Sequence, residues 1–166
     1  NKYLDDLENS AMIKIRSFEH LCQALEIRID YFNVHGCRLS DHGLEFLPYK
    51  KTSLSEIENI FKKSRNKKIL ELEEVEKFQT AILMFLCEQY HKFDWVQQFH
   101  LGAMRNNNSR MYNLLGADSG WDSIGQYPIA SNLSKFLDAL DQKNQLSKTI
   151  LYNLNPADSE VMVTML

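Results

Sequence analysis

What this sequence lacks excludes several classes of protein. It contains no apolar run near the roughly 18 residues that a membrane-spanning helix needs. It also has no excess of positive charge, since 19 Lys and Arg face 22 Asp and Glu and leave a net charge of −3. A chain of this charge has no overall field that attracts nucleic acid or an anionic membrane, so neither partner is expected.

Cysteine is scarce and shows no pairing pattern. The three cysteines, Cys22, Cys37 and Cys87, lie far apart and form no Cys-x-x-Cys pair. This spacing is typical neither of a disulfide framework nor of a zinc knuckle. We therefore expect free thiols in a reducing compartment, which for this protein means the cytoplasm.

The remaining composition is that of a folded domain. Of the 166 residues, 44% are hydrophobic and 25% are charged, which fits one soluble globular domain with an apolar core. Apolar residues recur at three- and four-residue steps in some segments, and short segments rich in β-formers separate them. The predicted helices cover 10–34, 53–63, 70–92 and 131–143. The predicted strands cover 37–43, 95–101 and 148–154, and end near Ser40, His100 and Leu154.

The order of these elements predicts the fold class. Helices that alternate with strands are typical of parallel strands joined by right-handed crossovers. A complete (β/α)8 barrel needs roughly 200 to 250 residues, so 166 residues can hold only part of one. The chain begins at Asn1 and stops within the helical pattern of 160–166, which we interpret as two cuts. We therefore predict an α/β fold, a partial (β/α) TIM-type barrel of about three parallel strands with flanking helices, in which 1–166 is an internal fragment of one barrel domain.

A charged segment indicates a helical insertion at about 52–70. The capping box Ser53-Leu-Ser-Glu56 begins a short helix. A basic cluster follows and is met directly by an acidic one that ends at Glu76. Nucleic-acid binding would need unopposed positive charge interleaved with aromatic residues, so a solvated pair of helices is the better interpretation.

The candidate functional residues lie where the first two strands end. Asp41 and His42 are expected to leave the first strand, His100 ends the second, and Arg105 and Arg110 lie in the polar stretch 106–130 or just before it. Parallel strands bring these positions to one face, where barrel enzymes hold their active sites. A histidine, two arginines and an Asp-His pair would suit a metal together with an anionic, hydroxyl-rich ligand, since the arginine fork matches a carboxylate.

Structural roles are the alternative for each of these residues. A histidine at a strand end is often a hydrogen-bonded structural residue, and Asp-His-Gly is common in turns. Asparagine runs such as Asn106-Asn-Asn108 often only shape a loop. These alternatives stay open on the residues alone.

Several segments resemble the uronate isomerase (glucuronate isomerase) family of the amidohydrolase barrel superfamily. The most distinctive is His100-Leu-Gly-Ala-Met-Arg-Asn-Asn-Asn108. Gly36-Cys-Arg-Leu-Ser-Asp-His-Gly43 is similar to the fourth-strand region of that family, and Ala117-Asp-Ser-Gly-Trp-Asp-Ser-Ile-Gly125 to its loop after the histidine strand. Leu146-Ser-Lys-Thr-Ile-Leu-Tyr-Asn-Leu-Asn-Pro156 is similar to the next strand, so the resemblance covers the whole chain.

The resemblance implies an aldose–ketose isomerase of hexuronate catabolism. Such enzymes interconvert D-glucuronate and D-fructuronate, or D-galacturonate and D-tagaturonate, by moving a proton between C2 and C1. It implies catalytic roles for His100 and Arg105, with His100 beside a divalent metal such as zinc. It implies substrate-binding roles for Asp41, His42 and Arg110. It also implies a hexuronate as the small-molecule partner and is compatible with a homo-oligomer.

Departures from the family pattern limit what this chain can do alone. The His-x-His pair of the first barrel strand, the Asp-Ser-Arg block of the last strand and a Trp-Trp-Phe segment are absent. Gln126 stands where an acid is expected. We therefore expect the fragment alone to be inactive. A metal-dependent amidohydrolase of the same fold, a non-catalytic sugar-acid binding module and an inactive truncated product remain as alternatives.

Overall fold

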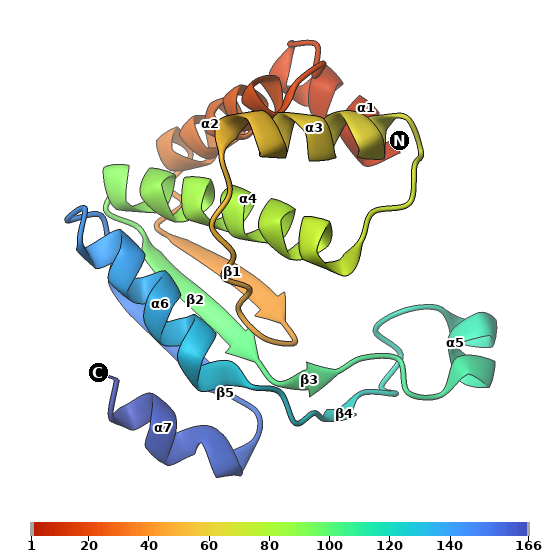
Figure 1. Cartoon of the computed structure of the whole chain (residues 1–166), viewed down its shortest axis with the longest axis vertical. Helices are drawn as coiled ribbons and strands as arrows, with labels where there is room; N and C mark the ends of the chain where they lie inside the picture. The colour runs from red at the N-terminus through yellow and green to blue at the C-terminus, as the bar shows by residue number, and fades with distance from the viewer. Residues whose placement is uncertain (1, 166) are drawn as a thin grey trace.

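The structure is a computed structural model that describes residues 2–165. Its helices and strands alternate after a helical N-terminal part (Figure 1). The elements are α1 (Lys2–Ala11), α2 (Phe18–Val34), β1 (Leu39–Leu44), α3 (Leu54–Arg65), α4 (Leu72–Lys92), β2 (Val96–Leu101), β3 (Ala103–Met104), α5 (Ser109–Leu115), β4 (Ser123–Ile124), α6 (Ile129–Asp141), β5 (Thr149–Asn153), the 3₁₀ turn η1 (Pro156–Asp158) and α7 (Ser159–Val163).

Three strands form the central sheet in the order β1-β2-β5. Both pairings are parallel, with Asp41 opposite Gln98 in the first and His100 opposite Tyr152 in the second. The predicted set of three parallel strands is therefore confirmed. A second, antiparallel sheet of β3 and β4 continues outward from the end of β2 and leads to α5 (Figure 1).

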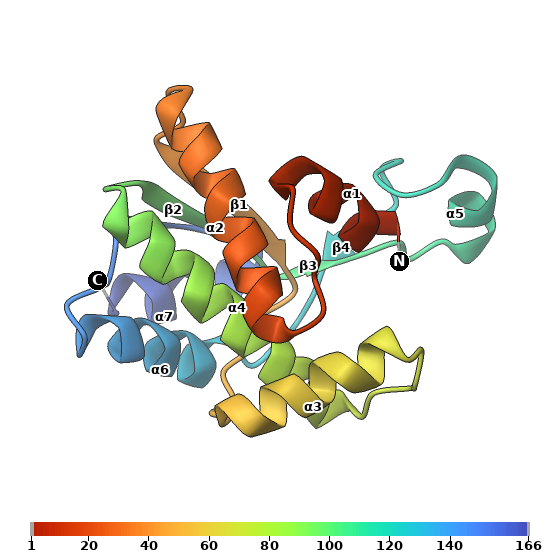
Figure 2. The same cartoon turned by 90° about the horizontal axis from the view of Figure 1, so that it is seen from above.

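The long helices cover one face of the parallel sheet. Figure 2 shows α4 and α6 on the same side of β1 and β2. Phe99 of β2 is fully buried there, and its ring meets Phe136 of α6 edge to face at 6.2 Å between ring centroids. Leu133 of α6 and Leu83 of α4 belong to the same apolar cluster. Burial of each such side chain stabilises the fold by about 1.5–3 kcal/mol, so this layer holds the strands in place.

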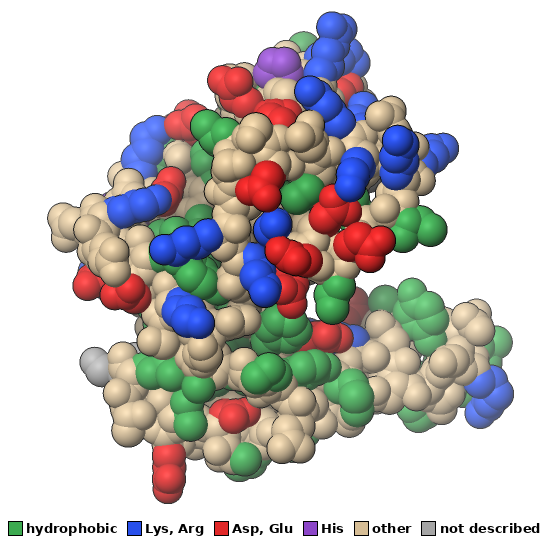
Figure 3. Space-filling view, in the orientation of Figure 1, with side chains coloured by type: hydrophobic (Ala, Val, Ile, Leu, Met, Phe, Trp, Pro, Cys, Tyr) green, Lys and Arg blue, Asp and Glu red, His purple; other side chains and the backbone are tan. Residues whose placement is uncertain are grey.

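A second apolar cluster joins the N-terminal helices to the predicted insertion. Ile57, Ile60 and Phe61 of α3 pack against α1 and α2. The capping box of Ser53 and Glu56 is present as predicted, with both reciprocal hydrogen bonds formed. Mixed charges cover this part of the surface, where ion pairs such as Lys63 with Glu74 link α3 to α4 (Figure 3).

The prediction of one helix over 10–34 is wrong, because two helices occupy this region. Helix α1 ends at Ala11, and Met12 takes a positive φ of 57° that stops helical geometry. Helix α2 begins after Ser17, whose hydroxyl accepts a hydrogen bond from the His20 N–H. The Glu58 carboxylate of α3 accepts the N–H groups of Phe18 and Glu19, which adds a second cap from elsewhere in the fold.

Three other features differ from the prediction. The stretch 106–130 is not all loop, because it contains α5 and β4, and α6 begins at Ile129 rather than after Ser131. Strand β1 continues to Leu44, so Asp41 and His42 lie within the strand rather than after it.

Along residues 2–165, no helix combines the length and apolar character needed to cross a membrane.

Candidate active site on the open face of the sheet

The two faces of the parallel sheet carry different side chains. Alternation along each strand sends neighbouring residues to opposite faces. Phe99 and Leu101 of β2 point toward the helices and are buried, whereas His100 between them is exposed on the other face. The open face also carries Leu39, Asp41, Gly43, Val96, Gln98, Ile150 and Tyr152.

His100 has neighbours from both flanking strands. Its Nε2 lies 3.2 Å from the Asp41 Oδ1 of β1. On the other side its ring stacks on Tyr152 of β5, with 4.3 Å between centroids and 5° between ring planes. His100 and Asp41 are each about half exposed, at 49% and 56% of the side chain, so the imidazole is held in place yet open to a ligand.

Arg105 directly follows β3, and its side chain reaches back to lie beside Gly43 of β1. Its Nη1 donates to the Asp122 Oδ2 at 2.7 Å, and the Asn106 N–H donates to the other carboxylate oxygen at 2.9 Å. These two hydrogen bonds lower the pKa of Asp122 below its usual value, and the bond from the Asn106 N–H has the larger effect. A Cβ on Gly43 would lie 3.1 Å from Arg105 Nη2, so the bare glycine backbone leaves the guanidinium room to approach the strand.

The histidine and the arginine share one hollow. A cavity of about 310 Å³ is lined by His100, Arg105, Asp122 and Tyr152, together with backbone and side chains at the ends of β2 and β5. It lies at the carboxyl ends of parallel strands, the position where α/β enzymes bind their ligands. The arrangement offers a half-exposed imidazole, a carboxylate and a guanidinium to one small polar molecule.

His42 lies on the opposite face from His100. Its Nε2 is 3.0 Å from the Tyr90 hydroxyl of α4, and its ring stacks on Phe99 at 5.8 Å between centroids. Burial lowers the pKa of His42, because the protonated form loses hydration in this apolar layer. The structure therefore does not bring His42 into the cavity with His100.

Arg110 is likewise separated from the cavity. It lies exposed on α5, which projects away from the parallel sheet (Figure 1). Of the five candidate residues, the structure thus brings together Asp41, His100 and Arg105.

Three neighbours of this group escaped the sequence interpretation. Gln98 precedes His100 by two residues and so shares its face, which the strand period could have revealed. Tyr152 and Asp122 become neighbours only through the strand register and the β3–β4 pairing, for which one sequence carries no signal.

The group does not complete a metal site. Among the described residues, no three His, Cys, Asp or Glu side chains gather in a way that could hold a metal ion. Asp41 and His100 supply two donors, whereas catalytic zinc takes three protein ligands. The residues present therefore do not fit a resident metal without further ligands.

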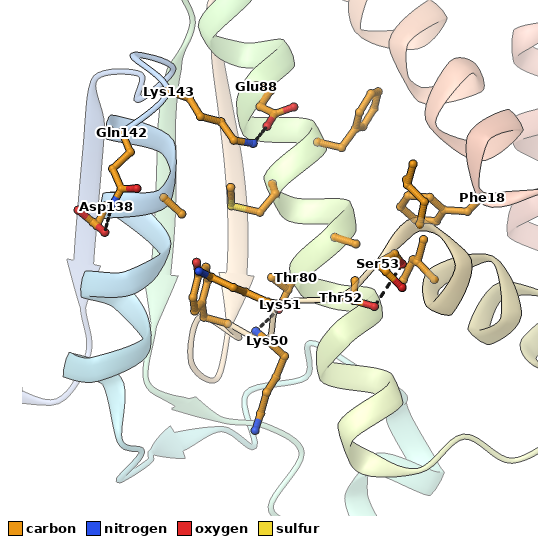
Figure 4. A pocket seen from close by; sticks show the side chains of 17 residues that line it. Phe18, Lys50, Lys51, Thr52, Ser53, Thr80, Glu88, Asp138, Gln142 and Lys143 are labelled. Atoms are coloured by element: carbon orange, nitrogen blue, oxygen red, sulfur yellow. Dashed lines mark hydrogen bonds and ion pairs between the residues drawn. The ribbon is translucent and has the colours of Figure 1, made fainter.

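A larger hollow lies elsewhere, among the helices. Its volume is about 680 Å³, and it is lined by residues of α3, α4 and α6 and of the segment before α3 (Figure 4). Its polar groups largely satisfy one another, since Lys143 pairs with Glu88 and the Lys50 N–H donates to Thr80. It contains none of the five candidate residues.

The fold and the site define the class of protein. Parallel strands with helices on one face and polar groups at their carboxyl ends are the arrangement of a segment of an α/β barrel. The family model described as glucuronate isomerase matches residues 1–166. The chain belongs to the uronate isomerase family.

Individual relatives agree with this assignment. The chain is 57% identical over 166 residues to a uronate isomerase of Flavobacterium johnsoniae and 53% identical over 166 residues to one of Cellvibrio japonicus. All of this chain is covered in both comparisons, but only 36% and 35% of the relatives. The chain spans about a third of the length of the curated relatives it matches.

Solved structures show the fold. The crystal structure of a uronate isomerase from Thermotoga maritima superposes with a TM-score of 0.92 at 24% identity, over 99% of this chain and 36% of that one. A glucuronate isomerase from Caulobacter crescentus gives 0.83 at 23% identity, over 95% and 32%. The predicted partial TIM-type barrel, with three parallel strands and flanking helices, is confirmed.

Proposed function

We propose that this chain is an internal segment of a uronate isomerase, and that the whole protein interconverts D-glucuronate and D-fructuronate, or D-galacturonate and D-tagaturonate, in hexuronate catabolism. The observation that carries the proposal is the family match along all 166 residues. The match favours the isomerase over the amidohydrolase and binding-module alternatives. The reaction moves a proton between C2 and C1, so it needs an acid/base group, stabilisation of an enediolate oxygen and a grip on the carboxylate.

The three residues that the structure brings together, Asp41, His100 and Arg105, are suited to these needs. His100, half exposed and tied to Asp41 at 3.2 Å, is suited to exchange a proton with the substrate. Arg105 lines the same cavity as His100, donates Nη1 to Asp122 and places Nη2 beside Gly43, and its guanidinium is suited to a carboxylate or an enediolate oxygen. Asp41 is suited to accept hydrogen bonds from sugar hydroxyl groups.

His42 and Arg110 stay predictions as substrate-binding residues. The contact of His42 with Tyr90 lies on the helix-facing side of β1, so it supports an indirect role, in which His42 helps to hold the strand that presents Asp41 on the other side. The place of Arg110 on α5 supports contact only with a ligand or element that reaches beyond the parallel sheet.

A divalent metal such as zinc belongs to the same proposal. Asp41 and His100 would need ligands from outside this chain to hold it, and a bound metal would polarise substrate oxygens.

We also propose a cytoplasmic location, which the free thiols of Cys22, Cys37 and Cys87 support. A homo-oligomer as the form of the whole protein belongs to the same proposal.

The experiment compares the full-length protein with the 166-residue chain. The full-length protein is expected to convert D-glucuronate to the ketose, followed as loss of the aldose signal by NMR. The chain alone is expected to show no turnover above its His100→Ala variant and at most weak zinc affinity, because one histidine and one carboxylate cannot chelate zinc strongly. An inactive full-length protein would contradict the activity, and turnover by the chain alone would contradict its interpretation as a fragment.

A further inference from the structure

Tyr152 lies directly beside His100 on the open face. The two residues are register partners across β2 and β5. Their rings are nearly parallel, at 5°, with 4.3 Å between centroids. Adjacent strands therefore present two flat side chains face to face, and the stack limits rotation of the imidazole about its side-chain bonds.

The tyrosine ring is itself fixed by a hydrogen bond. Its hydroxyl donates to the Gln98 Oε1 at 2.8 Å. Gln98 lies on β2 two residues before His100, and its Nε2 reaches the Ser40 carbonyl oxygen at 3.4 Å, a long contact. The tyrosine thus bridges β5 to β2 through two contacts, a stack on His100 and a hydrogen bond to Gln98.

Tyr152 lies outside the apolar layer that packs between the sheet and the helices. Its side chain is 42% exposed, and it lies on the face opposite Phe99 and Leu151. Ile150, two residues earlier on the same strand and face, is also 42% exposed and offers a matched comparison. The hydroxyl of Tyr152 is hydrogen-bonded and its ring is stacked on His100, a candidate catalytic residue. These contacts indicate that Tyr152 serves to hold the His100 ring.

We propose that Tyr152 is a positioning residue for His100, acting through the ring stack while Gln98 fixes the tyrosine. Asp41 holds the imidazole from one side and Tyr152 from the other, so the ring keeps one orientation at the mouth of the cavity. The inference rests on the proposed role of His100 in proton transfer. Geometry matters here, because a displacement near 1 Å of an acid/base group can cost roughly 100-fold in rate.

The test uses three variants of the full-length protein. Tyr152→Leu removes the stack and is expected to lower kcat roughly 10- to 100-fold while KM changes less than about twofold. Tyr152→Phe keeps the stack, loses only the bond to Gln98, and is expected to retain kcat within about fivefold. Ile150→Leu, the matched control, is expected to leave kcat, KM and the His100 spectrum unchanged.

A spectroscopic readout follows the stack itself. In protein labelled with ¹³C at the histidine rings, the His100 signal is assigned by its loss in His100→Asn. The ring-current effect of a stacked aromatic ring shifts the imidazole proton signals upfield. This upfield shift is expected in the wild type and in Tyr152→Phe. It is expected to vanish in Tyr152→Leu. A reduced melting temperature with unchanged kcat in Tyr152→Leu would overturn the proposal, because it would show a purely structural role.

Failure of the proposed function would be visible separately. If the full-length protein does not isomerise uronates, the spectrum still decides whether Tyr152 holds the His100 ring. An unshifted His100 signal in the wild type would overturn the positioning role whatever the activity.

Discussion

At the scale of single residues, two histidines of neighbouring strands are expected to behave differently. His100 lies on the open face, whereas His42 lies in the helix-facing layer beside Tyr90. The sequence could place both near the end of the sheet but could not assign their faces, since that depends on the strand boundary. The observed strand β1 runs through His42 to Leu44, and alternation then sends Asp41 and His42 to opposite sides.

The partly buried His42 predicts a pH dependence of stability. Because its pKa is lowered in the folded protein, the unfolded chain binds more protons below the ordinary value of 6.5. The free energy of unfolding should therefore fall as the pH drops below about 6.5. Urea titrations at pH 7.5 and pH 5 should show this loss in the wild type and a smaller one in His42→Gln. An equal loss in both would show that His42 is not its source.

Arg105 predicts a binding phenotype in the full-length enzyme. Arg105→Lys replaces a planar fork with a point charge, and lysine cannot keep both the bond to Asp122 and a bidentate grip on a carboxylate. KM should rise roughly 10- to 100-fold with a smaller change in kcat. Steady-state kinetics on D-glucuronate would measure this rise in KM. Asp122→Asn should also raise KM, but less than Arg105→Lys does. A loss confined to kcat would place Arg105 at the reacting atoms instead.

At the scale of elements, the strands could be predicted well and the helix boundaries less well. The three parallel strands follow from short β-rich segments between helices, and these patterns are local. The break between α1 and α2 depends on the positive φ of Met12 and on the Glu58 carboxylate, which arrives from about 40 residues away. Apolar periodicity runs through such a break, so the sequence pattern alone joined the two helices. The β3–β4 pairing that places Asp122 beside Arg105 also needs a contact across a long loop.

The cap of α2 predicts a local loss of stability. Ser17→Ala removes the hydroxyl that accepts the His20 N–H and should lower the free energy of unfolding by about 0.5–2 kcal/mol. Ser10→Ala is the control, because the Ser10 hydroxyl bonds only the Asp6 carbonyl oxygen within its own helix. Urea denaturation of both variants would measure the difference. Equal stabilities would show that Glu58 alone caps the helix.

At the scale of the whole molecule, the open face indicates that the sheet is part of something larger. Leu39 and Ile150 are 52% and 42% exposed on a face that no helix of the described residues covers. Strands β1 and β5 each pair on one side only within residues 2–165. The relatives are about three times as long as this chain, and in a closed barrel such a face becomes the interior. The sequence could place Asp41, His100 and Arg105 at one end of the sheet, but it could not place Tyr152 or Asp122 beside them, because those contacts depend on the strand register and on the β3–β4 pairing.

The central claim is that His100 belongs to the chemistry of a uronate isomerase, and one variant tests it most directly. In the full-length protein, His100→Ala should lower kcat/KM for D-glucuronate by about 30- to 1000-fold, the equivalent of roughly 2–4 kcal/mol. The melting temperature should stay near that of the wild type, because His100 lies on the face opposite the helix-facing apolar layer and contributes no side chain to it. A variant that keeps near-wild-type kcat/KM yet melts many degrees lower would contradict the account and make His100 a structural residue.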